Sequence, residues 1–201
     1  KAGVEPQAFC DKVSTRFREL ADAMNFSNDQ FIRTTEDRHK KAVQHLWSAL
    51  VEKGYIYEDS YAGWYSVRDE AFYSENELET GEGGEKLAPT GAPVEWVEEP
   101  SYFFKLSAFE DKLLELYDNQ PDFVMPKSRL NEVKSFVKGG LEDLSISRTT
   151  FSWGVPVPDA PGHIMYVWID ALTNYLTAIG YPDTTSDTYK AYWPADLHMV
   201  G

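Results

Sequence analysis

The segment His163–Gly180, "HIMYVWIDALTNYLTAIG", most constrains the fold because it joins a strand pattern directly to a helix pattern. Residues 163–169 are apolar, β-branched and aromatic in alternation, which predicts a strand. The residues after 170 predict a helix that ends at Gly180. Asp170 stands between them, where its carboxylate would cap the free amides of the first helical turn. A strand that passes through a tight corner into a helix is typical of α/β folds, which bind ligands at such corners.

Four residues of this segment share one face of a helix at about 100° per residue: Trp168, Ala171, Leu172 and Tyr175. They would line a single patch, in which the small Ala171 leaves room. Two interpretations stay open at this point, the wall of a ligand pocket and ordinary packing in the core.

The rest of the chain changes character twice. Residues 1–53 hold two stretches with helical spacing, and Val43, Leu46, Trp47 and Leu50 form the buried stripe of the second. Residues 55–106 are short β-rich, aromatic runs separated by Gly, Asn and Pro turns. Two more helices are predicted at 107–119 and 126–140, and from 141 onward strand and helix patterns alternate. This alternation predicts part of a parallel α/β sheet in which "ADLHMVG", residues 195–201, is a buried strand, and the chain reads as a piece of a larger protein.

The composition excludes several classes of function. A formal net charge of −14 argues against a general nucleic-acid-binding surface, although a local basic patch lies between residues 127 and 138. No apolar run reaches the roughly 20 residues of a membrane span, and no signal peptide is recognisable. The single cysteine, Cys10, suits a reducing compartment, so we expect a cytoplasmic protein. The four histidines of the chain are not spaced as metal ligands.

Three motifs, in this order, carry a family resemblance: "DLSISRTTFSWGVPVP", "YVWIDALTNY" and "DLHMVG". With them the chain resembles the methionyl-tRNA synthetases, a family of class I aminoacyl-tRNA synthetases, over most of its length. The resemblance implies an α/β fold, a partial Rossmann-type catalytic domain with an inserted, small β-rich connective-peptide domain flanked by helices. Residues 1–53 would be a helical part of the catalytic domain and 54–106 the insert. Residues 107–201 would be helices and the truncated second half of the catalytic domain.

The resemblance also implies roles for individual residues. Methionine would be bound by Trp168, Ala171, Leu172, Tyr175 and Tyr166. Arg148, the arginine of "SISR", would act electrostatically near the active site, and His198 and Gly201 would belong to the ATP-binding turn. Asp170 would hold the corner and would not be a catalyst. Two other readings stay open: His198 as a hydrogen-bonded core histidine, and Arg148 as part of a surface ion pair.

The sequence departs from the family pattern in two places. Where many members bind zinc through the cysteines of "YCxxCE", this chain has "YSVRDE", with Ser66 and Asp69 at the cysteine positions. We therefore expect no zinc, and a knuckle held by packing of Tyr65, Phe72 and Tyr73. Both nucleotide-binding signatures of class I synthetases, His-Ile-Gly-His and Lys-Met-Ser-Lys-Ser, are missing. We expect no catalytic residue in this segment and no activity from it alone.

The function that the resemblance implies is methionine–tRNA ligase. Such an enzyme activates L-methionine with ATP and Mg²⁺ and transfers it to initiator and elongator methionine tRNA, here together with the remaining segments of the same enzyme. A second hypothesis is a free-standing connective-type module that binds RNA or protein without catalysis. A third is a carbohydrate-acting protein, since aromatic residues and paired carboxylates could form a sugar platform.

Overall fold

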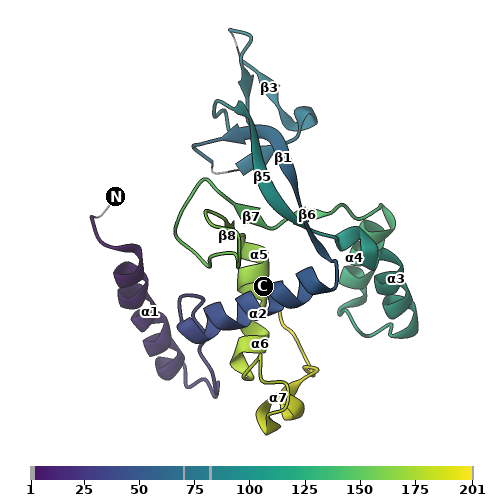
Figure 1. Ribbon diagram of the computed structural model, residues 1–201. Coiled ribbons are helices and arrows are strands. Elements are labelled where there is room, and N and C mark those ends of the chain that lie inside the picture. The colour runs from purple at the N-terminus through teal and green to yellow at the C-terminus, as the bar shows by residue number, and fades with distance from the viewer. Residues whose placement is uncertain (1–2, 70, 82, 201) are drawn as a thin grey trace. The chain divides into compact units, whose positions relative to one another are not determined.

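The chain divides into two compact units. A computed structural model describes residues 3–69, 71–81 and 83–200 (Figure 1). The first unit comprises Lys1–Glu52 and Thr150–Gly201, and the second comprises Lys53–Thr149. The sequence predicted an insert at 54–106. The second unit begins one residue earlier and extends further, so that it includes the helices between residues 107 and 140.

The first unit is mainly helical. Its elements are α1 (Pro6–Ala23), α2 (Asp37–Glu52), β8 (Ile164–Met165), α5 (Val167–Leu172), α6 (Asn174–Ala178) and α7 (Asp187–Tyr192). The two helices predicted within residues 1–53 are both present. Helix α2 packs against α6. Of the predicted stripe on α2, Val43 and Trp47 are buried, and Leu46 and Leu50 are half-buried.

Helix α1 is amphipathic, but its apolar side chains are largely accessible. Phe9, Phe17 and Leu20 are between 51% and 60% exposed. An ion pair between Asp11 and Arg33 ties the helix to the segment that precedes α2. In the part of the chain that the structure describes, no helix combines the length and the apolar character that crossing a membrane requires.

The second unit is built on a four-stranded sheet of order β2-β1-β5-β6. Its strands are β1 (Ile56–Ser66), β2 (Ala71–Tyr73), β5 (Glu95–Phe104) and β6 (Leu144–Ser145), and the smaller pair is β3 (Glu79–Thr80) and β4 (Lys86–Leu87). The long strands β1 and β5 pair antiparallel, from Ile56 opposite Phe104 to Tyr65 opposite Glu95. Figure 1 shows them as one long ribbon, with β3 beyond its far end.

Two helices complete the second unit at the other end of this ribbon (Figure 1). They are α3 (Glu110–Asn119) and α4 (Lys127–Lys138), and short 3₁₀ turns lie at Glu75–Glu77 and Leu106–Phe109. The two helices share a cluster of buried side chains: Tyr117, Leu130, Val137 and Leu141. Pro126 precedes α4 as its N-cap, and Gly140, with φ at +97°, follows its end. A positive φ suits glycine, which has no Cβ, so the predicted end of this helix is confirmed.

The structure corrects the expected strand–corner–helix at 163–180. Only Ile164–Met165 form a strand, and α5 begins at Val167 with Tyr166 as its N-cap residue. Asp170 therefore lies in the first turn of the helix, and the prediction that it is the N-cap is wrong. The aromatic and β-branched residues at 166–169 favour a strand intrinsically, but such preferences amount to only about 1 kcal/mol and yield to tertiary packing.

The sheet pairings within the second unit differ from the expected parallel arrangement. The pairings of β1 with β2, of β1 with β5, of β5 with β6 and of β3 with β4 are all antiparallel. Residues 195–200 form no strand, and Leu197 and Met199 are 73% and 83% exposed. A parallel strand needs a neighbouring strand reached through a crossover connection. Residues 195–200 pair with no strand among the described residues of the first unit.

Candidate functional site

Helices α5 and α6 present two contrasting faces. Trp168 and Leu172 are 59% and 56% exposed, whereas Thr173 and Thr177 are buried. Ala171, Tyr175 and Tyr166 are half-buried. That 168, 171, 172 and 175 share one side stays a prediction, since Trp168 and Leu172 are exposed on α5 whereas Tyr175 lies on the next helix, α6. Because Trp168 and Leu172 are more than half accessible, ordinary core packing does not account for them in this chain.

The buried face is held by hydrogen bonds to a histidine of α2. His39 is fully buried, with Nε2 at 2.8 Å from Oδ1 of Asp170 and Nδ1 at 2.9 Å from Oγ1 of Thr177. The hydroxyl of Thr173 also donates to the carbonyl of Ile169 at 2.7 Å, and that of Thr177 lies 3.1 Å from the carbonyl of Thr173. Asp170 thus anchors α5 to α2 instead of capping it.

A cavity of about 510 Å³ in the first unit brings two of the predicted site residues together. Tyr175 and His198 both line it, and their rings stack with centroids 4.5 Å apart. Trp193 lines the same cavity, with its ring centroid 6.3 Å from that of His198. His198 is exposed, so it is not a core histidine. Trp168, Ala171 and Leu172 do not line this cavity, and Gly201 lies outside the described residues.

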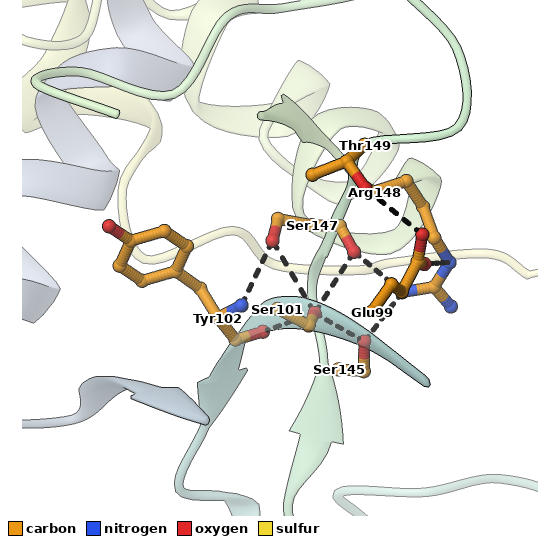
Figure 2. Close-up of polar contacts among 7 residues, drawn as sticks. All are labelled: Glu99, Ser101, Tyr102, Ser145, Ser147, Arg148 and Thr149. Atoms are coloured by element: carbon orange, nitrogen blue, oxygen red, sulfur yellow. Dashed lines mark hydrogen bonds and ion pairs between the residues drawn. The ribbon is translucent and has the colours of Figure 1, made fainter. Parts of the chain in front are cut away.

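Arg148 lies in the second unit, on β7 (Ser147–Arg148), within a polar cluster that Figure 2 shows. Its Nη1 donates to Oγ of Ser145 at 2.5 Å and to the carbonyl of Ser147 at 2.7 Å. Its Nε lies 3.9 Å from Oε1 of Glu99, and the two side chains are only 13% and 6% exposed. The reading of Arg148 as part of a surface ion pair is therefore wrong, because the pair is buried.

Glu99 is the residue of this cluster that the sequence reasoning missed. Its Oε2 accepts from the hydroxyl of Thr149 at 3.1 Å. Its Oε1 is buried without a hydrogen-bond donor among the described residues, which leaves the charge of Arg148 as its compensation. Because side chains alternate along a strand, Glu99 is in phase with Ser101, which is also buried. That phase was the signal available in the sequence.

The serines around Arg148 fix the strands that carry the ion pair. Oγ of Ser101 lies 2.7 Å from Oγ of Ser145 and donates at 3.0 Å to the carbonyl of Ser147 (Figure 2). Oγ of Ser147 accepts from the amide of Tyr102 at 2.9 Å. The cluster thus joins β5, β6 and β7 at the point where Glu99 meets Arg148.

The turn between β1 and β2, where the resemblance places a zinc knuckle, is organised by Asp69. Its carboxylate accepts from the hydroxyls of Thr90 and Tyr73 and from Nε of Arg68. Hydrogen bonding from Thr90 is the main reason that the pKa of Asp69 lies below its usual value. Ser66 is fully buried and its Oγ accepts from the amide of Asp69 at 3.3 Å.

Of the predicted aromatic packing of this turn, the contact between Tyr65 and Phe72 is present, with the ring centroids 4.8 Å apart, whereas Tyr73 contributes a hydrogen bond to Asp69. The carboxylate-centred hydrogen bonds of Asp69 were not predicted. Among the described residues, no group of three or more His, Cys, Asp or Glu side chains is arranged to hold a metal ion.

Comparison with known proteins identifies the family. The model of the family described as "tRNA synthetases class I (M)" matches residues 1–83 and 84–201. This chain belongs to that family. A methionine–tRNA ligase of Brucella suis biovar 1 (strain 1330) is 59% identical over 201 residues, and one of Rickettsia typhi (strain Wilmington) is 62% identical over 198. These alignments cover 100% and 98% of this chain.

Solved structures of the class I synthetases agree with this assignment. A crystal structure of Mycobacterium tuberculosis methionyl-tRNA synthetase bound by methionyl-adenylate superposes on this chain with a TM-score of 0.88 at 55% identity, over 100% of this chain and 40% of that one. The apo form of the same enzyme gives a TM-score of 0.83. The chain spans 39% of the Brucella protein and 38% of the Rickettsia protein. The α/β fold expected of a class I synthetase is confirmed.

Proposed function

We propose that this chain is the central part of a cytoplasmic methionine–tRNA ligase. The observation that carries the proposal is the 55% identity, over the whole chain, to a synthetase whose structure contains methionyl-adenylate. The enzyme would use ATP with Mg²⁺ to activate L-methionine and would pass the product to initiator and elongator methionine tRNA. In this proposal the first unit is part of the catalytic domain, and the second unit contains the connective-peptide insert.

The activation step needs no nucleophilic side chain from the enzyme. A carboxylate oxygen of methionine attacks the α-phosphorus of ATP, and the bond from that phosphorus to pyrophosphate breaks. The rate then depends on aligning the two substrates and on stabilising the charge on phosphate. The proposed contribution of this segment is to bind and orient the substrates.

The accessible side of α5 and α6 is suited to an unbranched thioether. Trp168 and Tyr175 offer aromatic rings, and contacts between sulfur and an aromatic ring are favourable by about 0.3–1.5 kcal/mol. Ala171 leaves room between them, while Leu172 and Tyr166 complete the proposed wall. Arg148 would supply positive charge near the substrates. His198 and Gly201 would adjoin the adenosine, where a glycine allows close approach of the backbone.

The proposal predicts that Trp168→Ala, made in the full-length enzyme, raises the KM for methionine about tenfold or more, a factor worth about 1.4 kcal/mol. The KM for ATP should change much less, because Trp168 is proposed to contact only the amino acid. Methionine-dependent exchange of pyrophosphate into ATP measures both constants. Trp96→Ala is a matched control, since Trp96 is 58% exposed and Trp168 59%.

Thermal unfolding of both variants separates binding from stability. Replacing a packed tryptophan by alanine costs roughly 3–5 kcal/mol, whereas an accessible one costs far less. Trp168→Ala could unfold at a much lower temperature than wild type and yet keep a normal methionine KM below its unfolding temperature. That result would show that Trp168 is a packing residue. A wild-type enzyme without methionine-dependent exchange would overturn the proposed function itself.

A further inference from the structure

His39 connects three helices of the first unit through one side chain. It projects from α2, and its two ring nitrogens reach Asp170 on α5 and Thr177 on α6 at 2.8 and 2.9 Å. An ionised carboxylate can only accept hydrogen bonds, so Nε2 is the nitrogen that carries a proton toward Asp170. The imidazole is fully buried, and the side chain of Asp170 is 19% exposed.

The two helices that His39 joins are short and are separated by a break. Helix α5 has six residues and α6 has five, with Thr173 between them. Isolated helices shorter than about 12 residues are marginal in water, so tertiary contacts must maintain this pair and the angle between its members. His39 hydrogen-bonds to both helices, on the side opposite to the exposed Trp168 and Leu172.

Burying a polar side chain at position 39 costs desolvation free energy. That cost is justified where the direction of its hydrogen bonds is needed. An aliphatic residue on α2 would cover α5 and α6 without desolvating an imidazole and a carboxylate. Unlike aliphatic contacts, two hydrogen bonds at opposite edges of a rigid ring define a direction for each helix. They therefore constrain where α5 presents Trp168 and where α6 presents Tyr175.

We propose that His39 is a positioning residue for methionine recognition, which acts through Asp170 and Thr177 to set the relative placement of Trp168 and Tyr175. This inference rests on the proposed function of the chain. His39 does not touch the substrate in this scheme. Its loss should therefore weaken methionine binding through displaced pocket residues while leaving ATP binding nearly unchanged.

The test uses the full-length enzyme and pyrophosphate exchange, with His39→Ala compared to His45→Ala. His45 is a matched control on the same helix, because it is exposed and its Nδ1 lies 2.9 Å from the hydroxyl of Tyr181, away from α5. We expect His39→Ala to raise the methionine KM about tenfold with an ATP KM within about twofold of wild type, the size of effect that pocket contacts produce. His45→Ala should leave both constants within about twofold.

A double-mutant cycle shows whether His39 acts through Asp170. If it does, His39→Ala should raise the methionine KM by less than about twofold once Asp170→Ala is present, since coupled residues are not additive. Asp170→Asn keeps an acceptor oxygen for Nε2–H and should stay closer to wild type than Asp170→Ala does. If His39 had a purely structural role, His39→Ala would lower the melting temperature but would not raise the methionine KM selectively. Asp170→Asn would then be no closer to wild type in methionine KM than Asp170→Ala.

The outcomes separate the inference from the proposed function. Wild-type enzyme without methionine-dependent exchange would refute the proposed function, and the inference with it. Active wild type in which His39→Ala changes the methionine and ATP constants equally, or changes neither, would overturn the inference alone. If His39→Ala does not fold, Thr177→Val decides, because it removes at nearly constant volume the hydroxyl that contacts Nδ1 of His39 and the carbonyl of Thr173. We then expect about a threefold rise in the methionine KM, and no rise would overturn the inference.

Discussion

Substituting Glu99 by Gln isolates the contribution of one buried charge. Glutamine keeps the size of the side chain and an oxygen that can accept from Thr149, and it removes the negative charge that faces Arg148. Losing one partner of a buried ion pair costs about 3–5 kcal/mol. The lower end applies here, because the 3.9 Å separation exceeds hydrogen-bond length and Arg148 keeps its bonds to Ser145 and Ser147. We expect a loss of about 3 kcal/mol in the local stability of β5.

Hydrogen exchange followed by mass spectrometry measures this loss in the full-length protein, on peptides that cover Glu95–Phe104. A change of about 3 kcal/mol corresponds to amide exchange that is faster by about a hundredfold, where exchange reports the opening equilibrium. Glu98→Gln is the control, since Glu98 is the adjacent, exposed carboxylate, and its Oε1 accepts from Ser60 at 3.0 Å. It should cost less than about 0.5 kcal/mol. Equal exchange in the two variants would refute the argument that the charge of Glu99 stabilises this cluster.

Two predictions concern the turn between β1 and β2. The hydrogen bond from Thr90 holds the pKa of Asp69 below its usual value of 3.8, so the stabilisation is complete above that value and is lost as the pH falls below it through the folded-state pKa. Asp69→Asn should therefore melt below wild type near neutral pH and approach it on acidification, and identical melting temperatures at neutral pH would contradict this. Elemental analysis of the dialysed 201-residue chain should find far less than one zinc per chain, because Ser66 and Asp69 supply no thiolate; about one zinc per chain would disprove it.

The longer helices could be predicted because local patterns determine them. Helix α2 repeats apolar residues at helical spacing, and Pro126 and Gly140 bracket α4 with backbone preferences that need no partner elsewhere in the chain. The β-rich character of residues 55–106 was readable for the same reason, since aromatic and β-branched residues alternate there. The register between β1 and β5 was not predicted, because it depends on pairs that are distant in the sequence, from Tyr65 with Glu95 to Ile56 with Phe104.

The segment at 163–170 was predicted wrongly because its preferences and its environment disagree. Trp168 and Ile169 favour a strand, yet both lie in α5. Hydrogen bonds that join Asp170 and Thr177 to His39 hold this segment as helix from its buried side. A single sequence does not reveal that His39, 131 residues earlier in the chain, supplies the partner of Asp170.

His39 and Glu99 share a property that sequence reasoning can use. Each lies in phase with a buried pattern, His39 with Val43 and Trp47 on α2 and Glu99 with Ser101 on β5. An ionisable side chain at such a position costs free energy unless a polar or charged group compensates it. The phase therefore predicts that a compensating partner exists, although the fold alone determines which residue it is. The partner of His39 is Asp170, which is adjacent to Ala171, and the partner of Glu99 is Arg148. The family resemblance had assigned functional roles to Ala171 and Arg148. A polar residue that falls among the buried positions of a helix or strand is thus a reason to look for a functional site near the residue that it pairs with.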